Sequence, residues 1–100
     1  MIVKKMNTDN PQEIIQNDID EEVTVKLPYK VILFNDDWHS FEEVINQIIK
    51  AVQCSYDMAR GYAFEAHVKG KAVVYNGELN QCLKVSSVLE EISLHTQIVS

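Results

Sequence analysis

The chain has 100 residues, of which 46% are hydrophobic and 24% are charged, a composition typical of one small globular domain. Nine basic and 15 acidic residues give a net charge of −6, which argues against nucleic acid or an anionic membrane as partner, because both require a cationic face. No apolar run is long enough to span a bilayer, and no signal peptide is evident. Cys54 and Cys82 lack a Cys-x-x-Cys spacing and are too few for a disulfide scaffold. We therefore expect a monomeric, cytoplasmic protein with reduced thiols.

The composition changes near Pro28. Residues 1–27 hold six acidic residues and three lysines, but no aromatic residue and no sustained hydrophobic period. A segment of this kind cannot cover a core. We predict a flexible acidic N-terminal extension over residues 1–27 and a folded core domain over residues 28–100.

The core domain begins with a predicted strand at Tyr29–Phe34, whose residues are mostly β-branched or aromatic. Asn35–Asp37 ends this strand, because Asn and Asp side chains bond their own backbone and favour turns. Ser40 and Glu43 have the Ser-x-x-Glu spacing of a capping box. Apolar residues then recur at helical spacing, which predicts an amphipathic helix of about three turns over Phe41–Val52.

A second helix is predicted to begin after Ser55 and to end near residues 67–69, where Gly70 supplies a left-handed stop. Its apolar side is expected at Met58, Ala59, Tyr62, Ala63 and Ala66. The second strand is predicted over residues 71–75. The Asn76-Gly77 pair that follows it predicts a turn.

A third helix follows, and a short strand at residues 95–99 closes the chain. The apolar stripe of this helix is expected at Leu79, Cys82, Leu83, Ser86, Leu89 and Ile92. The order β-α-α-β-α-β predicts a small two-layer α+β domain, with a three-stranded antiparallel sheet and three helices on one face.

Motifs for catalysis or metal binding are not evident. The three histidines and two cysteines include no pair with the spacing of zinc ligands. No phosphate-binding loop and no glycine-rich nucleophile elbow occur, and the whole chain has three glycines. We therefore expect neither an enzyme, nor a metal site, nor a cofactor.

The unusual segment is the turn at residues 35–39, which places an amide, two carboxylates, an indole and an imidazole in five positions. Binding residues tend to sit on such loops. Trp38 either flanks a pocket or packs as a partly buried ring over the sheet edge, and His39 alone would be a solvated loop residue. His67 alone is explained by the dipole at the end of the second helix.

Two blocks together resemble the ClpS family, the N-degron adaptors of the Clp protease. The first is Tyr29–Asp37, followed by an aromatic residue, and the second is Glu65–Val73, which includes a histidine at the position of His67. The spacing of the blocks and the order of the elements also agree with that family. The resemblance covers about residues 28–100, after a polar tail of the family's kind.

The resemblance implies recognition of the N-terminal residue of a substrate protein. Its α-ammonium has three donors and one positive charge. The resemblance implies that this group donates hydrogen bonds to the amide oxygen of Asn35, the carboxylate of Asp37 and a neutral ring nitrogen of His67. Asp36 is expected to shape the turn and to add negative potential.

The family's pocket for the substrate side chain maps onto mostly apolar positions. These are Leu33, Phe34, Asp37, His39, Phe41, Val44, Ala63 and Ala66. The family's usual Thr, Pro and Met in the turn are replaced here by His39, Ser40 and Phe41, and a Met and a Val of helix two by alanines. We predict a pocket for N-terminal Leu, Phe, Tyr or Trp. His39 is also a candidate hydrogen-bond partner for a Tyr hydroxyl or a Trp indole.

Unfoldase docking in the family involves the region around helix three, where Glu78 and Lys84 match but the surrounding run departs from the family pattern. The implied partner is the N-domain of a ClpA- or ClpC-like AAA+ unfoldase, whose pore would engage the N-terminal extension. The leading hypothesis is an adaptor that delivers N-degron substrates to this unfoldase. One alternative is a diverged module that docks without binding N-degrons. A resemblance in fold to the C-terminal domain of the ribosomal stalk protein is poorly supported, because residues 28–100 contain only six basic residues.

Overall fold

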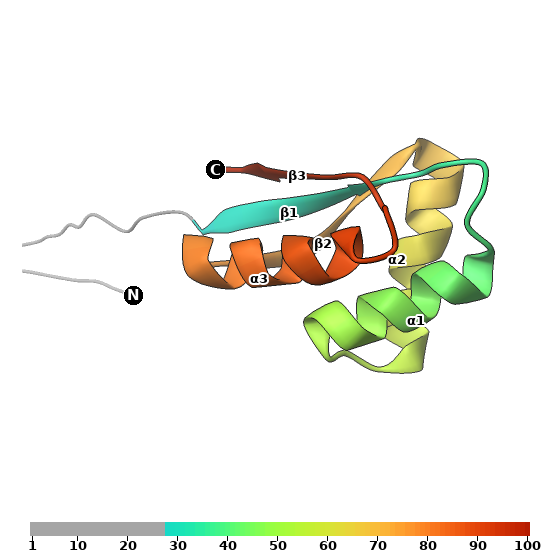
Figure 1. The fold of residues 1–100 in the computed structure, drawn as a ribbon, viewed down its shortest axis with the longest axis horizontal. Helices are drawn as coiled ribbons and strands as arrows, with labels where there is room; N and C mark the ends of the chain where they lie inside the picture. The colour runs from blue at the N-terminus through green and yellow to red at the C-terminus, as the bar shows by residue number, and fades with distance from the viewer. Residues whose placement is uncertain (1–27) are drawn as a thin grey trace, which may run out of the picture.

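The computed structural model describes residues 28–100, which form three strands and three helices in the predicted order (Figure 1). The elements are β1 (Tyr29–Phe34), α1 (Phe41–Val52), α2 (Tyr56–Lys69), β2 (Lys71–Gly77), α3 (Leu79–Glu90) and β3 (Thr96–Val99). The α+β class is therefore confirmed. The predicted extension over residues 1–27 lies outside the described residues.

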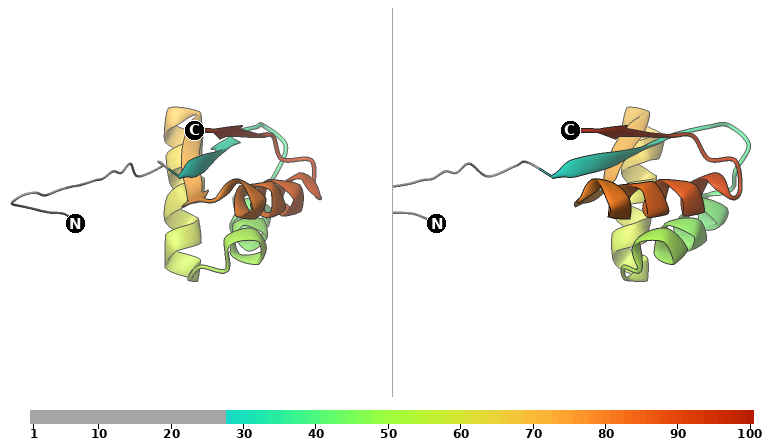
Figure 2. Two further views of the ribbon diagram at one scale, coloured as in Figure 1. Left: turned by 90° about the vertical axis from the view of Figure 1, so that its left-hand side faces the viewer. Right: turned by 60° about the vertical axis from the view of Figure 1, so that its left-hand side comes forward.

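The sheet has the order β2-β1-β3, and β1 is antiparallel to both neighbours. Val31 and Leu33 of the central strand are buried on the face that meets the helices. The register between β1 and β2 shifts between Val31 and Ile32, which marks a β-bulge. Figure 2 shows α1 and α3 under the sheet, while α2 stands beside β2.

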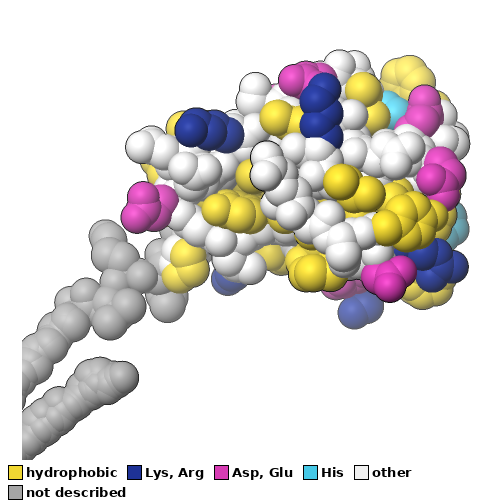
Figure 3. All heavy atoms as spheres, turned by 90° about the horizontal axis from the view of Figure 1, so that it is seen from below, with side chains coloured by type: hydrophobic (Ala, Val, Ile, Leu, Met, Phe, Trp, Pro, Cys, Tyr) yellow, Lys and Arg dark blue, Asp and Glu magenta, His cyan; other side chains and the backbone are white. Residues whose placement is uncertain are grey.

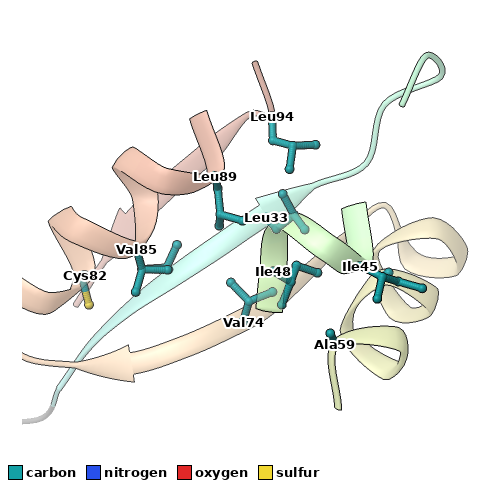
Figure 4. Close-up of a cluster of buried hydrophobic side chains, with 11 residues drawn as sticks. Leu33, Ile45, Ile48, Ala59, Val74, Cys82, Val85, Leu89 and Leu94 are labelled. Carbon is teal, nitrogen blue, oxygen red and sulfur yellow. The ribbon is translucent and has the colours of Figure 1, made fainter. Parts of the chain in front are cut away.

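The core lies between the sheet and the three helices (Figure 4). Its largest fully buried side chains are Leu33, Ile45, Ile48, Leu89, Val31, Val74 and Cys82. α1 contributes residues at i and i+3, and β1 and β2 each contribute alternate residues, as the two periodicities require. This core holds the end of β1 against the helices and so fixes where the following turn begins.

The predicted start of α1 and both predicted ends of α2 are confirmed. Ser40 Oγ accepts a hydrogen bond from the Glu43 backbone N–H at 3.1 Å, and Glu43 Oε1 accepts one from the Ser40 N–H at 2.7 Å, which completes the capping box. Ser55 Oγ accepts the Met58 N–H at 3.1 Å at the start of α2. Gly70 ends α2 with φ of 90°, a backbone conformation that favours glycine.

Two predicted features near β2 and α3 are wrong. Asn76 and Gly77 do not form a turn, because both belong to β2 and pair with the start of β1. An Asn-Gly pair signals a hairpin only where a strand follows, and here α3 follows. The stripe of α3 also differs, since Leu79 and Leu83 are 41% and 52% exposed, whereas the buried residues are Cys82, Val85 and Leu89.

Two boundaries and the exposure of one side chain also differ from prediction. Ile92 lies beyond the end of α3, and β3 begins at Thr96 rather than at His95. Met58 is exposed rather than on the packed side of α2. Met58 lies in the first turn of α2, where little of the rest of the domain covers it.

Candidate binding site

A cavity of about 580 Å³ opens where β1 ends, between the following turn, α1 and α2. Its lining residues are Leu33, Phe34, Asn35, Asp36, Asp37, His39, Phe41, Val44, Arg60, Ala63, Phe64, Ala66, His67 and Leu94. Every residue predicted for the ammonium group or for the side-chain pocket is among them. The fold therefore brings these residues together on one cavity, while their roles in binding stay predictions.

The sequence analysis missed three lining residues, Arg60, Phe64 and Leu94. Arg60 and Phe64 share the spacing i, i+3, i+4, i+7 with Ala63 and His67, which places all four on one face of α2. This helical spacing is visible in the sequence, but the predicted pocket included only apolar residues of α2 and His67. Leu94 lies in the connection before β3, where no local pattern indicates its position.

Backbone hydrogen bonds fix both sides of the entry to the turn. The Asn35 N–H donates to the Gly70 carbonyl oxygen at 2.9 Å, and the Phe34 N–H donates to the His95 carbonyl oxygen at 3.0 Å. The first bond ties the turn to the end of α2. Asn35 is therefore held near the last turn of α2, which carries His67.

Asp36 shapes the turn through its side chain. Its Oδ1 accepts hydrogen bonds from the backbone N–H groups of Trp38, at 3.0 Å, and His39, at 2.9 Å. Its Oδ2 lies 2.6 Å from His39 Nδ1. The two side chains are only 18% and 12% exposed, so the expectation that His39 is a solvated loop residue is wrong.

The same contacts shift the acid–base properties of this pair. Burial alone would raise the pKa of Asp36, but hydrogen bonds from the backbone and side chain of His39 and from the backbone of Trp38 outweigh it and lower the pKa. The hydrogen bond with Asp36 raises the pKa of His39, against a smaller opposing effect of burial, and a bond to the Ile92 carbonyl adds to the increase. The pair therefore favours a carboxylate facing an imidazolium.

His39 lines the cavity at its predicted position, but its ring is not available for the expected bond to a ligand, and Trp38 does not lie where it was expected. Both ring nitrogens of His39 already have partners, Asp36 and the Ile92 carbonyl, so neither is free to bond a Tyr or Trp side chain in the cavity. Trp38 is 82% exposed and does not line the cavity. The prediction that Trp38 packs over the sheet edge is therefore wrong.

Asn35, Asp37 and His67 contrast with this paired turn. All three residues are exposed and line the cavity. Within residues 28–100, no hydrogen bond or ion pair engages the side chains of these three. The cavity therefore has several polar groups that are available to a bound molecule.

The apolar wall of the cavity comes from α1, α2 and the end of β1. Ala63 and Ala66 are buried and leave room on the α2 side, while Phe41 and Phe64 are partly exposed at its border. Figure 3 shows apolar side chains gathering toward the end of the molecule that α1 and α2 occupy, with charged groups around them. An apolar hollow with a few polar groups is the usual form of a ligand site.

The residues predicted for docking lie elsewhere. Glu78 is the residue before α3 and makes no side-chain capping bond, and Lys84 lies within α3. Both are exposed, and neither lines the cavity. The structure therefore separates the predicted docking residues from the predicted pocket.

Neither a metal-binding cluster nor a membrane-spanning helix occurs within residues 28–100. No group of three or more His, Cys, Asp or Glu side chains within residues 28–100 is arranged to hold a metal ion. No helix in that range is both long enough and apolar enough to cross a bilayer. Cys54 and Cys82 are free thiols.

Residues 25–97 match the family described as ATP-dependent Clp protease adaptor protein ClpS. The chain belongs to the ClpS family. This family consists of adaptors, so the chain is an adaptor-type domain and not an enzyme. The match covers β1 to the first part of β3 and includes every residue that lines the cavity.

Known ClpS and ligase proteins resemble this ClpS-family chain. The structure of Agrobacterium tumefaciens ClpS2 bound to L-phenylalaninamide has a TM-score of 0.65 and 25% sequence identity, over 72% of this chain and 96% of that chain. The E3 ubiquitin-protein ligase UBR2 of Homo sapiens is 36% identical over 61 residues, and that of Mus musculus 34%. This region is 61% of the chain but spans only 4% of the length of each ligase.

Proposed function

We propose that this domain binds the N-terminal residue of substrate proteins when that residue is large and hydrophobic, and that it delivers these substrates to a Clp unfoldase. The observation that carries the proposal is a cavity with an apolar wall and, beside it, the side chains of Asn35, Asp37 and His67, which have no partner within residues 28–100. The L-phenylalaninamide in the similar ClpS2 structure has a free α-amino group and a phenyl side chain, which supports the same chemistry.

The α-ammonium group would be held by three acceptors. Asn35 offers its amide oxygen, Asp37 its carboxylate, and His67 a neutral ring nitrogen, which together satisfy the three N–H donors of the ammonium. Each charge-assisted hydrogen bond contributes about 1.5–3 kcal/mol. An acetylated or internal amide lacks the charge and two of the donors, so this arrangement would select free N-termini.

The substrate side chain would occupy the apolar part of the cavity. Burial of one large apolar side chain contributes about 1.5–3 kcal/mol. The small side chains of Ala63 and Ala66 leave space for Phe, Tyr, Trp or Leu. Arg60 also lines the cavity, and its positive charge opposes an N-terminal Lys or Arg. After the costs of ordering, a micromolar affinity, about −8 kcal/mol, is expected.

Delivery would use a second surface on the same domain. Glu78 and Lys84 on the α3 side match the docking region of the family, and their separation from the cavity leaves substrate and unfoldase able to bind together. The partner would be the N-domain of a ClpA- or ClpC-like unfoldase in the cytoplasm. Residues 1–27 would be the segment that its pore engages.

The proposal is tested by fluorescence anisotropy with labelled peptides that differ only at the first residue. The series begins with Leu, Phe, Tyr, Trp, Ile and Arg, with acetyl-Phe as the control for the free amine. We expect micromolar binding of the aromatic and Leu peptides, weak binding of Arg, and none of acetyl-Phe. The N-domain of an unfoldase, titrated separately, tests the delivery half.

The outcomes separate the candidate functions. Binding of free aromatic N-termini together with the N-domain supports the complete adaptor. Binding of the N-domain by a folded protein that ignores every free N-terminus would instead favour a module that docks and modulates the unfoldase. Equal binding of Phe and acetyl-Phe peptides would contradict recognition of the ammonium group.

A further inference from the structure

The turn after β1 contains a pair of polar side chains whose bonds stay inside the protein. His39 Nδ1 lies 2.6 Å from Asp36 Oδ2, and both side chains are largely buried. The other ring nitrogen, Nε2, lies 2.5 Å from the carbonyl oxygen of Ile92, which is 53 positions further along the chain. His39 therefore joins the binding turn to the connection between α3 and β3.

Both partners of the ring are acceptors, and this decides its protonation state. A neutral imidazole has one N–H, so only an imidazolium can donate to a carboxylate and a carbonyl together. The charged groups facing the ring are acidic, with Asp36 in the turn and Glu43 on α1. On the α3 side, Glu91 follows the end of the helix, but Lys50 neutralises it at 2.9 Å.

Asp36, one member of this pair, lies between two residues that the proposed function requires. Asn35 precedes Asp36 and is tied to Gly70 by its backbone N–H. Asp37 follows Asp36, and the next two backbone N–H groups both donate to Asp36 Oδ1. The backbone before Asp37 is therefore held by the bond from Asn35 to Gly70, and the backbone after Asp37 is held by bonds to the Asp36 side chain.

We propose that His39 is a positioning residue, whose imidazolium clamps Asp36 to the Ile92 carbonyl and thereby holds Asn35 and Asp37 in place for the substrate's ammonium group. This inference rests on the proposed function and identifies what pre-organises its site. The cost of ordering the turn is met during folding and not during binding, which increases affinity.

The clamp has a defined dependence on pH. The hydrogen bond with Asp36 raises the pKa of His39. A group with a raised pKa contributes its interaction fully below its unperturbed pKa and loses it as the pH rises through the raised value. The contribution of His39 to binding is therefore greatest in mildly acidic solution and disappears in alkaline solution.

The first experiment compares the wild type with His39→Ala by anisotropy of a Phe-initiated peptide, between about pH 6 and about pH 8.5. The expected result is roughly tenfold weaker binding by His39→Ala at the lower pH and a smaller difference between the two proteins at the higher pH. Any pH dependence of peptide binding that does not come from His39 occurs with both proteins, so it cancels in the ratio of the two affinities.

Three further variants separate the clamp from other effects. Asp36→Asn combined with His39→Ala should bind no more weakly than the weaker single variant, because the two residues act as one unit. Glu43→Gln removes a nearby negative charge while its amide oxygen can still complete the capping box, and His95→Ala removes a histidine that stacks on Phe34 instead. Because Glu43 adds to the increase in the pKa of His39, Glu43→Gln should keep the wild-type affinity at the lower pH and lose affinity at a lower pH than the wild type does. The affinity of His95→Ala relative to that of the wild type should be the same at both pH values.

A second measurement needs no peptide. Amide hydrogen exchange of Trp38 and His39 reports on the N–H groups that donate to Asp36, and we expect it to be at least several-fold faster in His39→Ala. Unchanged exchange, or a loss of affinity that is the same at every pH, would overturn the clamp. If the wild type binds no free N-terminus, the proposed function itself fails, whereas equal binding by wild type and His39→Ala overturns only the clamp.

Discussion

The turn after β1 and the outer surface of α3 carry polar residues in two different arrangements. Asn35, Asp37 and His67 line one cavity, and their side chains have no hydrogen-bond or ion-pair partner within residues 28–100. Glu78 and Lys84 are separately exposed on the α3 side and line no cavity there. Figure 1 shows the turn and the start of α3 at opposite ends of the domain. Polar side chains that line one cavity suit the binding of a small chemical group, whereas separate exposed charges suit contact with the surface of another protein.

The same comparison holds within the turn itself. Within residues 28–100, the side chains of Asp36 and His39 form hydrogen bonds, whereas the side chains of Asn35 and Asp37 form none. Residues with satisfied bonds build the site, and residues with unsatisfied groups are the ones that a ligand can use. Four polar residues within a five-residue turn thus divide into two roles that residue type alone does not reveal.

The largest expected effect separates the turn from the rest of the surface. Asp37→Asn keeps the shape of the side chain but removes the charge that faces the ammonium, so the affinity for a Phe-initiated peptide should fall about 30- to 100-fold, which corresponds to about 2–3 kcal/mol. Titration of the labelled peptide, followed by fluorescence anisotropy, measures this loss of affinity. Asp57→Asn is the matched control, because this residue loses the same charge in the first turn of α2 and does not line the cavity.

The next effect sharpens the account of the apolar wall. Ala63→Met would fill part of the cavity, so the affinity for a Trp-initiated peptide should fall about tenfold, while a Leu-initiated peptide loses less. Competition between the two peptides gives the ratio directly. A uniform loss for both peptides would contradict the placement of the substrate side chain against Ala63.

A smaller effect tests the other side of the comparison. Lys84→Glu should weaken binding to an unfoldase N-domain about fivefold, since exposed charge pairs contribute about 1 kcal/mol or less. Its affinity for a Phe-initiated peptide should match that of the wild type. If Lys84→Glu instead weakens peptide binding, the two surfaces are not independent and the comparison fails.

The smallest effect concerns stability alone. A side chain at Gly61 of α2 would meet no atom within 4 Å, so Gly61→Ala should raise the free energy of unfolding by about 0.5–1 kcal/mol through helix propensity. Urea denaturation measures this change. The affinity for peptides should not change, and a loss would mean that this face of α2 takes part in binding.

Most of the fold was predictable because its signals are local. The capping box at Ser40, the N-cap at Ser55 and the left-handed stop at Gly70 each depend on a few neighbouring residues, and the structure contains all three. The Asn76-Gly77 turn failed because pairing with β1, far away in the sequence, keeps these residues extended. Local propensity decides a segment only where no tertiary contact competes with it.

The candidate site was predictable in membership but not in its internal bonding. The predicted pocket residues converge on one cavity, and the ClpS resemblance supplied them as a set. The bond from His39 to the Ile92 carbonyl joins segments 53 positions apart, so no local pattern could reveal it. Arg60 and Phe64 could have been found from helical spacing, because a lining residue need not belong to the apolar stripe.

The central claim is that one end of the domain recognises a free N-terminus. The most direct test is to follow the backbone amide signals of the protein by NMR during titration with a Phe-initiated peptide and with its acetylated form. We predict that the free peptide shifts the signals of residues 35–39 and of the last turn of α2, that α3 from Leu79 to Lys84 stays unchanged, and that the acetylated peptide shifts neither region. Shifts confined to α3, or the same shifts with both peptides, would contradict the account.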